Sequence, residues 1–218
     1  MLLHFPLYFF FIIIAFILSF LIFFQAKTPF HLKLFTVFLG ITLLVEGIGL
    51  HLRSKGQNNY VLYICFSAVE FSFYLYVISR IIHNFLFKRI IWFILIINFI
   101  ISISGALFIQ KSSFNSVAYS INCLFIVFFC IYYFLELFRY PKFVNLKNEP
   151  AFWICSGLLF YYCCSLPLFG LITLLSGVPQ GIIRNLFIIV NVLNILLYTS
   201  FAIAFVCRIK IKKSVSLL

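Results

Sequence analysis

The chain has 218 residues, of which 65% are hydrophobic and only 9% are charged, and its formal net charge is +12. Soluble domains are about 45–50% apolar and about 25% charged, and a folded soluble chain needs more surface charge than this one carries. The composition therefore excludes a soluble globular domain and predicts an integral membrane protein.

The basic residues fall almost entirely between long apolar runs. In a soluble protein a charge of +12 would suggest a nucleic-acid partner. Between apolar runs, the same residues are instead expected to set membrane topology. We therefore expect the lipid bilayer as the surroundings and no nucleic acid as a partner.

Seven apolar runs are long enough for a membrane-crossing helix, which needs about 20 mostly apolar residues. Because open β-structure leaves polar backbone groups unpaired in lipid, each run is predicted to be a helix. The fold class is therefore all-α: one polytopic transmembrane bundle over residues 1–218, with no soluble domain. The predicted spans are 7–24, 34–52, 60–81, 90–109, 117–138, 151–175 and 182–207.

Seven spans divide the Lys and Arg residues unequally between the two sides of the membrane. Twelve fall on the side of the C-terminus, and four (Arg53, Lys55, Lys111 and Arg184) fall on the other side. The positive-inside rule then places the C-terminus in the cytoplasm and the N-terminus outside. The alternative is six spans, with one apolar run lying in the membrane interface.

Span 7–24 has almost no polar residue except Ser19 and is expected to face lipid. Span 34–52 carries Glu46, which shares a helical face with Thr42 and Gly49. Ionisable groups inside a bilayer are costly, so Glu46 is a candidate functional residue. His51, five residues further outward, is a candidate sensor of external pH.

Span 60–81 carries the second intramembrane carboxyl, Glu70, in a polar stripe with Tyr63, Ser67 and Tyr74. Glu46 and Glu70 lie on neighbouring antiparallel spans and differ in depth by only about 5 Å. We expect them to face each other in one polar cavity. Two carboxyl groups in such a site do not both ionise cheaply, so at least one is expected to be protonated.

Spans four and seven are expected to complete this cavity. Span four contributes Asn98, and span seven contributes Arg184, Asn191, Asn194 and Tyr198. The alternative is that these polar side chains only hold helices together by hydrogen bonds, and that Arg184 extends to the membrane interface.

The remaining polar residues near span ends are expected to be structural. Glu136 and Arg139 stand three positions apart at the end of span five, which predicts a local ion pair. The four histidines lie at span ends on different sides of the membrane, so no metal site and no cofactor is expected. Spans of known intramembrane enzymes also carry Asp, His or Ser patterns that are missing here, and no enzyme is predicted.

The segment NLKNEPAFWICSGLLFYYC (145–163), together with the seven short-looped spans, resembles uncharacterised bacterial seven-span proteins. Some of these are similar to the membrane input modules of sensor histidine kinases. The resemblance implies a sensory or regulatory module in the bacterial inner membrane that signals to a separate kinase or membrane partner. The contact with that partner or with anionic lipid is expected at Arg208, Lys210, Lys212 and Lys213.

A second hypothesis is a small proton-coupled transporter or channel subunit that uses Glu46 and Glu70. A ligand, a transported species and an oligomeric state do not follow from the sequence.

Overall fold

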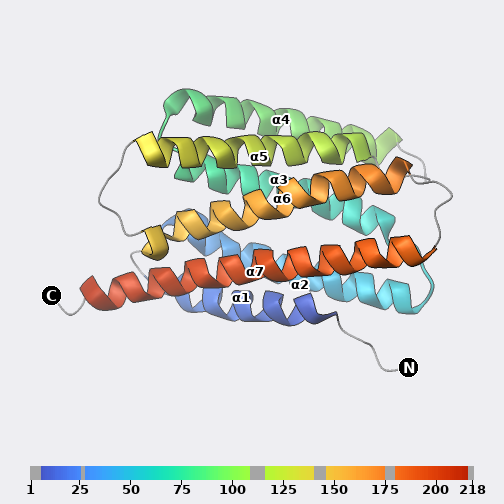
Figure 1. Cartoon of the computed structure of the whole chain (residues 1–218), viewed down its shortest axis with the longest axis horizontal. Helices are drawn as coiled ribbons and strands as arrows, with labels where there is room; N and C mark the ends of the chain where they lie inside the picture. Colours follow the sequence, from blue (N-terminus) through green and yellow to red (C-terminus); the bar gives the residue numbers. More distant parts are fainter. Residues whose placement is uncertain (1–5, 26–27, 109–115, 140–145, 175–179, 216–218) are drawn as a thin grey trace.

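The computed structural model describes residues 6–25, 28–108, 116–139, 146–174 and 180–215, with side chains described for 6–25, 28–59, 61–98, 119–139, 146–168 and 186–209. The described residues form helices joined by short turns and contain no strand, which confirms the all-α class (Figure 1). The elements are α1 (Leu7–Phe23), α2 (Phe30–Ser54), α3 (Tyr60–Ile81), α4 (Phe85–Phe108), α5 (Ser116–Arg139), the 3-10 turn η1 (Leu146–Asn148), α6 (Pro150–Leu174) and α7 (Gln180–Val215).

Within the described residues, five helices are long and apolar enough to cross a membrane: Phe30–Ser54, Val61–Ile81, Tyr119–Arg139, Pro150–Leu168 and Leu186–Ile209. Helix α1 is shorter, with 17 residues, or about 25 Å of helix. A hydrocarbon core is about 30 Å thick. The structure thus supports a membrane protein, whereas the count of seven spans stays a prediction.

The helix ends differ from the apolar runs that predict them. Helix α2 begins at Phe30 directly after Pro29, and α6 begins with Pro150. Proline suits the first helical position, as at Pro150, because its fixed φ fits the first turn and its missing N–H has no intrahelical partner there. Helix α7 continues past the apolar run into the basic tail and reaches 36 residues, since Lys, Arg and Ile are compatible with a helix.

Successive helices run in opposite directions along one axis, so α1 begins at one end of the bundle and α7 finishes at the other (Figure 1). The end at which α7 finishes, called the basic end below, also holds the α3–α4 and α5–α6 connections. The described side chains there include Arg80, Lys88, Arg89, Arg139 and Lys147, and the opposite end holds Arg53 and Lys55. The charge asymmetry expected from sequence is therefore an asymmetry between the two ends of the bundle.

The bundle is aromatic inside and apolar outside. Phe35 of α2 is fully buried, and its ring packs 5.2 Å from Phe201 and 5.5 Å from Phe205 of α7. At the surface, Leu44, Phe93 and Phe85 are 65–74% exposed. Soluble proteins rarely expose apolar patches this extensive, so this surface suits contact with lipid.

Helix α1 packs against α2 and α7. Its residues Ile12, Ala15, Ser19 and Ile22 are buried, while Phe10, Ile14 and Ile17 on the other face are about half exposed. The expectation that this span faces lipid is therefore wrong for one side of the helix. The error arose because an all-apolar helix has no polar stripe to show which of its sides is inside.

Helices α6 and α7 approach each other closely at Gly157. A Cβ atom on this glycine would lie 2.7 Å from Cβ of Ser200 on α7. Small residues at such contacts let transmembrane helix backbones approach each other. A residue with a side chain at position 157 would therefore push the two helices apart.

Candidate functional site

The carboxyl group of Glu46 joins three helices. Its Oε2 atom accepts a hydrogen bond from the Tyr8 hydroxyl of α1 at 2.8 Å and another from the Tyr63 hydroxyl of α3 at 3.3 Å. Glu46 itself lies on α2 and is half-buried. A hydrogen bond contributes about 0.5–1.5 kcal/mol, or about 1.5–3 kcal/mol where the acceptor is charged, so this carboxyl links α1, α2 and α3.

The position of Tyr63 depends on Gly49 of α2. A Cβ atom at Gly49 would lie 2.5 Å from the Tyr63 hydroxyl oxygen, whereas a Cβ atom at Gly47 would meet nothing within 4 Å. The absence of a side chain at Gly49 therefore lets the Tyr63 ring cross the face of α2 and reach Glu46. Gly47, two residues earlier, has no such role.

Glu70 of α3 is half-buried and lies within electrostatic range of Glu46. The Tyr74 hydroxyl lies beside it one turn along α3, although the pair does not reach hydrogen-bond geometry. Helices α6 and α7 bring further hydroxyl groups into range of Glu70, those of Tyr161, Tyr162 and Tyr198.

Two of the tyrosine hydroxyls near Glu70 are buried without a partner. Among the described residues, neither Tyr74 Oη nor Tyr162 Oη makes a hydrogen bond, and both side chains are fully buried. The two rings lie 6.1 Å apart, edge to face. A buried hydroxyl without a partner costs about 1–3 kcal/mol, so both groups have unused capacity to bind a polar molecule.

Several residues predicted for the cavity make other contacts. Thr42 is fully buried and donates to the backbone oxygen of Phe38, and Ser67 donates to that of Ile64. Asn194 donates to the backbone oxygen of Val190. These bonds lie within the helices concerned, as is common for Ser, Thr and Asn side chains in a helix.

Asn98 of α4 forms a hydrogen bond with a residue that the sequence did not single out. Its Nδ2 atom donates to Oδ1 of Asn122 on α5 at 2.8 Å. This bond favours the alternative in which the amide holds two helices together. Asn191 is half-buried on α7, and Tyr198 is 4% exposed with its ring 6.1 Å from that of Phe201.

Other predicted site residues lie at the ends of helices. His51 is exposed near the end of α2, and its backbone oxygen accepts a bond from the Ser54 hydroxyl. Arg208 is half-buried near the basic end. The side chains of Arg184, Lys210, Lys212 and Lys213 lie outside the described residues, although their backbones belong to α7.

Sequence reasoning missed Tyr8, which makes the shorter of the two bonds to Glu46. Tyr8 is the one hydroxyl-bearing aromatic residue among the phenylalanines of α1. That difference was a usable signal, because a tyrosine in an apolar helix usually places its hydroxyl against a polar partner. Helix α1 begins well within the length of α2, which sets Tyr8 beside Glu46 rather than at the end of α2 (Figure 1).

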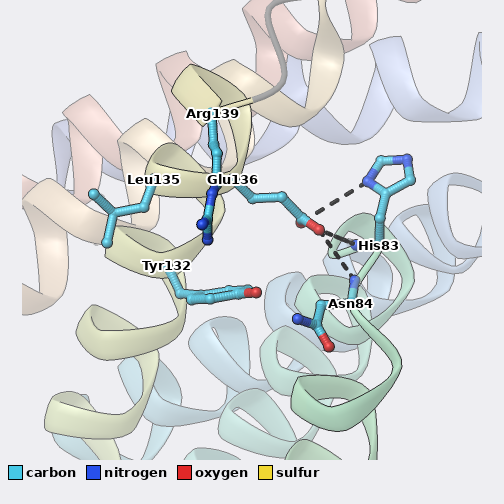
Figure 2. Close-up of a pocket in the computed structure, with 6 residues that line it drawn as sticks. All are labelled: His83, Asn84, Tyr132, Leu135, Glu136 and Arg139. Carbon is cyan, nitrogen blue, oxygen red and sulfur yellow. Dashed lines mark hydrogen bonds and ion pairs between the residues drawn. The ribbon is translucent and has the colours of Figure 1, made fainter.

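A second polar site lies at the basic end, between α4, α5 and the α3–α4 turn (Figure 2). Glu136 of α5 accepts backbone N–H bonds of 3.0–3.2 Å from His83 and Asn84, directly before α4 begins. His83 Nδ1 lies 3.9 Å from the same carboxyl group. The expected ion pair of Glu136 with Arg139 is therefore wrong, because unpaired N–H groups at a helix start attract a carboxylate strongly.

This site borders a half-open cavity of about 410 Å³, called the basic-end cavity below. Figure 2 shows Arg139 and Tyr132 of α5 on one side and Asn84 on the other. The lining residues are His83, Asn84, Tyr132, Leu135, Glu136 and Arg139.

The two sites present carboxyl, hydroxyl, imidazole, amide and guanidinium groups, which can bind polar or charged molecules. Within the described part of the chain, no group of three or more His, Cys, Asp and Glu side chains is placed to hold a metal ion. Comparison of the chain with protein-family models, curated proteins and solved structures finds no match. The Glu46–tyrosine contacts and the basic-end cavity therefore carry the functional inference.

Proposed function

We propose that the chain is a sensory or regulatory module of the cell membrane, in which binding at the half-buried carboxyl groups of Glu46 and Glu70 changes the packing of α1, α2 and α3. The observation that carries the proposal is the double hydrogen bond from Tyr8 and Tyr63 to Glu46. One carboxyl group thereby controls contacts among three helices.

The energy of these contacts is suited to a switch. Neutralising Glu46 by a proton or a cation would weaken two bonds that contribute about 1.5–3 kcal/mol each to a charged acceptor. Differences of this size shift a two-state equilibrium by about tenfold or more. The hydroxyls of Tyr74 and Tyr162 near Glu70 have no hydrogen-bond partner in the described structure, so they are available to bind a small polar ligand.

The signal is proposed to leave at the basic end. Helix α7 packs on both α1 and α6 and continues to Val215, so a change in α1 packing reaches the tail through one rigid element. A separate kinase or membrane protein would read this change, as the resemblance of residues 145–163 to bacterial sensor modules implies. A bacterial inner membrane is the proposed location for the same reason.

A small proton-coupled transporter or channel subunit is the second candidate function. It is favoured by the electrostatic proximity of Glu46 and Glu70, with tyrosine hydroxyls around both carboxyl groups. Paired intramembrane carboxyl groups of this kind occur in proton relays.

Reconstitution of the purified chain into liposomes separates the two functions. Proton or ion flux that Glu70→Gln abolishes would establish transport and overturn the sensory proposal. The sensory proposal instead requires no flux, together with a partner protein that co-purifies through the tail and dissociates in the Glu46→Gln variant. Ser67→Ala is a matched control, because Ser67 bonds only within its own helix in the described structure.

A further inference from the structure

Two pockets, together called the α4–α5 groove below, lie along α5 on the side that faces α4 and the α3–α4 turn. The polar basic-end cavity lies just before the start of α4, and a second, open pocket of about 410 Å³ lies between α4 and α5, farther from the basic end. The second cavity is lined only by apolar residues: Ile90, Ile94, Leu124, Phe125, Phe128 and Phe129. Within the described residues, α4 packs mainly on α3 and α5 mainly on α6, and α4 and α5 meet at Phe87–Tyr132 and Asn98–Asn122.

On both helices, the residues that line the apolar cavity lie farther from the basic end than the residues that line the basic-end cavity. On α4, Ile90 lies six residues after Asn84, or about 9 Å deeper. On α5, Phe128 lies four residues before Tyr132, or about 6 Å deeper. Phe87 lies between the two pockets, because its ring stacks on Tyr132 at 3.6 Å and lies 6.4 Å from Phe128.

Arg139 supplies the positive charge among the residues that line the polar cavity, and Glu136 supplies a negative one. The Glu136 carboxylate is committed to backbone N–H groups of His83 and Asn84 and is only 10% exposed. Arg139 is exposed, and none of the carboxyl groups in the described part of the chain lies within ion-pair distance of it. Lys88 and Arg89 follow near the start of α4.

The basic-end cavity also presents hydrogen-bond donors. Asn84 Oδ1 already accepts the N–H of Leu86, which leaves its Nδ2 group as a donor. The Tyr132 hydroxyl and the Arg139 guanidinium face this amide across the cavity (Figure 2). Guanidinium groups bind phosphate through two parallel hydrogen bonds, so this donor set matches a phosphate ester.

We propose that the α4–α5 groove binds one anionic phospholipid, with its phosphate at Arg139, Tyr132 and Asn84 and an acyl chain along the apolar cavity. The polar and apolar parts follow each other in the order in which a phospholipid presents its headgroup and its chain. The exposed apolar residues Ile90, Leu124 and Phe128 open the groove toward surrounding lipid. A soluble phosphate would occupy only the polar basic-end cavity.

The test is a titration of the purified full-length chain in detergent with phosphatidylglycerol or phosphatidylcholine of the same acyl chains, followed by native mass spectrometry. One phosphatidylglycerol per chain is expected to bind about tenfold more tightly than phosphatidylcholine, which corresponds to about 1.4 kcal/mol. Arg139→Gln should remove this preference. Arg53→Gln is the matched control, because Arg53 is exposed at the opposite end of the bundle.

The apolar half of the groove is tested with Leu124→Trp, which places a larger side chain in the apolar cavity. This variant should bind phosphatidylglycerol at least severalfold more weakly and should still bind its soluble headgroup, glycerol phosphate, as the wild type does. Equal affinity of the wild type for glycerol phosphate and phosphatidylglycerol would instead identify a phosphate site and overturn the lipid proposal.

The wild-type chain supplies a test that depends on no variant. Binding of phosphatidylglycerol should weaken as ionic strength rises from about 0.01 to 1 M, because the Debye length falls from about 30 to 3 Å. Phosphatidylcholine binding should change little over that range. Salt-independent binding of phosphatidylglycerol, or an unchanged preference in Arg139→Gln, would show that the groove does not recognise an anionic headgroup.

Discussion

The Tyr8 hydroxyl lies 2.8 Å from Oε2 of Glu46, and this bond joins residues 38 positions apart on α1 and α2. The contact fixes a short helix against a half-buried carboxyl group. It also gives the N-terminal helix a defined place in the bundle, which its apolar sequence does not specify.

Replacing Tyr8 by Phe should lower the stability of the bundle. The change removes one bond to the carboxyl group while keeping the ring, at a cost of about 0.5–3 kcal/mol, with the upper end for an ionised carboxyl group. Thermal unfolding in detergent measures the loss. Tyr76→Phe is the control, because the Tyr76 ring packs on Trp92 and no hydrogen bond of its hydroxyl is part of the described structure. Equal melting temperatures for the two variants would contradict the assigned role of Tyr8.

The two glycines of α2 should respond differently to alanine. Alanine favours a helix over glycine by about 1 kcal/mol, so Gly47→Ala should be neutral or stabilising. In Gly49→Ala the new methyl group would displace the Tyr63 hydroxyl and break its bond to Glu46. A double-mutant cycle of Gly49→Ala with Tyr63→Phe should therefore show coupling between the two positions. Additive effects on unfolding would mean that Gly49 does not position Tyr63.

Gly157→Ala should separate α6 from α7 and cost about 1–3 kcal/mol through overpacking. Because the nearest atom is Cβ of Ser200, Ser200→Gly should restore part of the loss. Ser200→Ala keeps that atom and should not restore it. The melting temperatures of Gly157→Ala/Ser200→Gly and Gly157→Ala/Ser200→Ala measure this rescue. Equal rescue by both would mean that Cβ of Ser200 is not the atom that the new methyl group meets.

Glu136→Gln should destabilise the start of α4. The substitution removes a negative charge at a helix N-terminus, which contributes about 0.3–1 kcal/mol, and weakens hydrogen bonds to the backbone of His83 and Asn84. Hydrogen exchange at residues 83–88 should become faster. Glu149→Gln, on the η1–α6 connection, should leave this exchange unchanged, and so serves as the control for charge alone.

The topology is testable with reporter fusions. A reporter attached after Leu218 should report the cytoplasm, and one inserted between Arg53 and Asn59 should report the exterior, because the basic end is expected to face inward. The exposed turn there contains Gly56 with a φ of 68° and tolerates insertion better than a helix would. The same compartment for both sites would rule out the predicted orientation.

Helices are the part of the structure that the sequence predicts best. Apolar runs of about 20 residues require helices in lipid, and α2, α3, α5, α6 and α7 contain segments of the required length and composition. Helix ends are less well predicted, because polar residues such as Lys210 continue a helix beyond its apolar run. This is why α7 extends past Cys207.

Contacts between residues of different helices are harder to predict from the sequence. Helical periodicity shows that Glu46 shares a face with Thr42, but it does not show which residue of a distant helix meets that face. Tyr8 and Asn122 were missed for this reason. Glu136 shows the related error of preferring a neighbour in sequence, Arg139, over backbone groups that only the folded chain brings near.

Helix α7 runs without a break through 36 residues, or about 54 Å, which exceeds a hydrocarbon core of about 30 Å. At the basic end it extends past the other helices (Figure 1). A continuous helix transmits rotation about its axis as well as displacement. The direction in which side chains at its far end point is therefore fixed by how the helix packs in the bundle. Inserting one residue between Arg208 and Lys213 would rotate everything beyond by about 100°, and four residues would nearly restore the original direction.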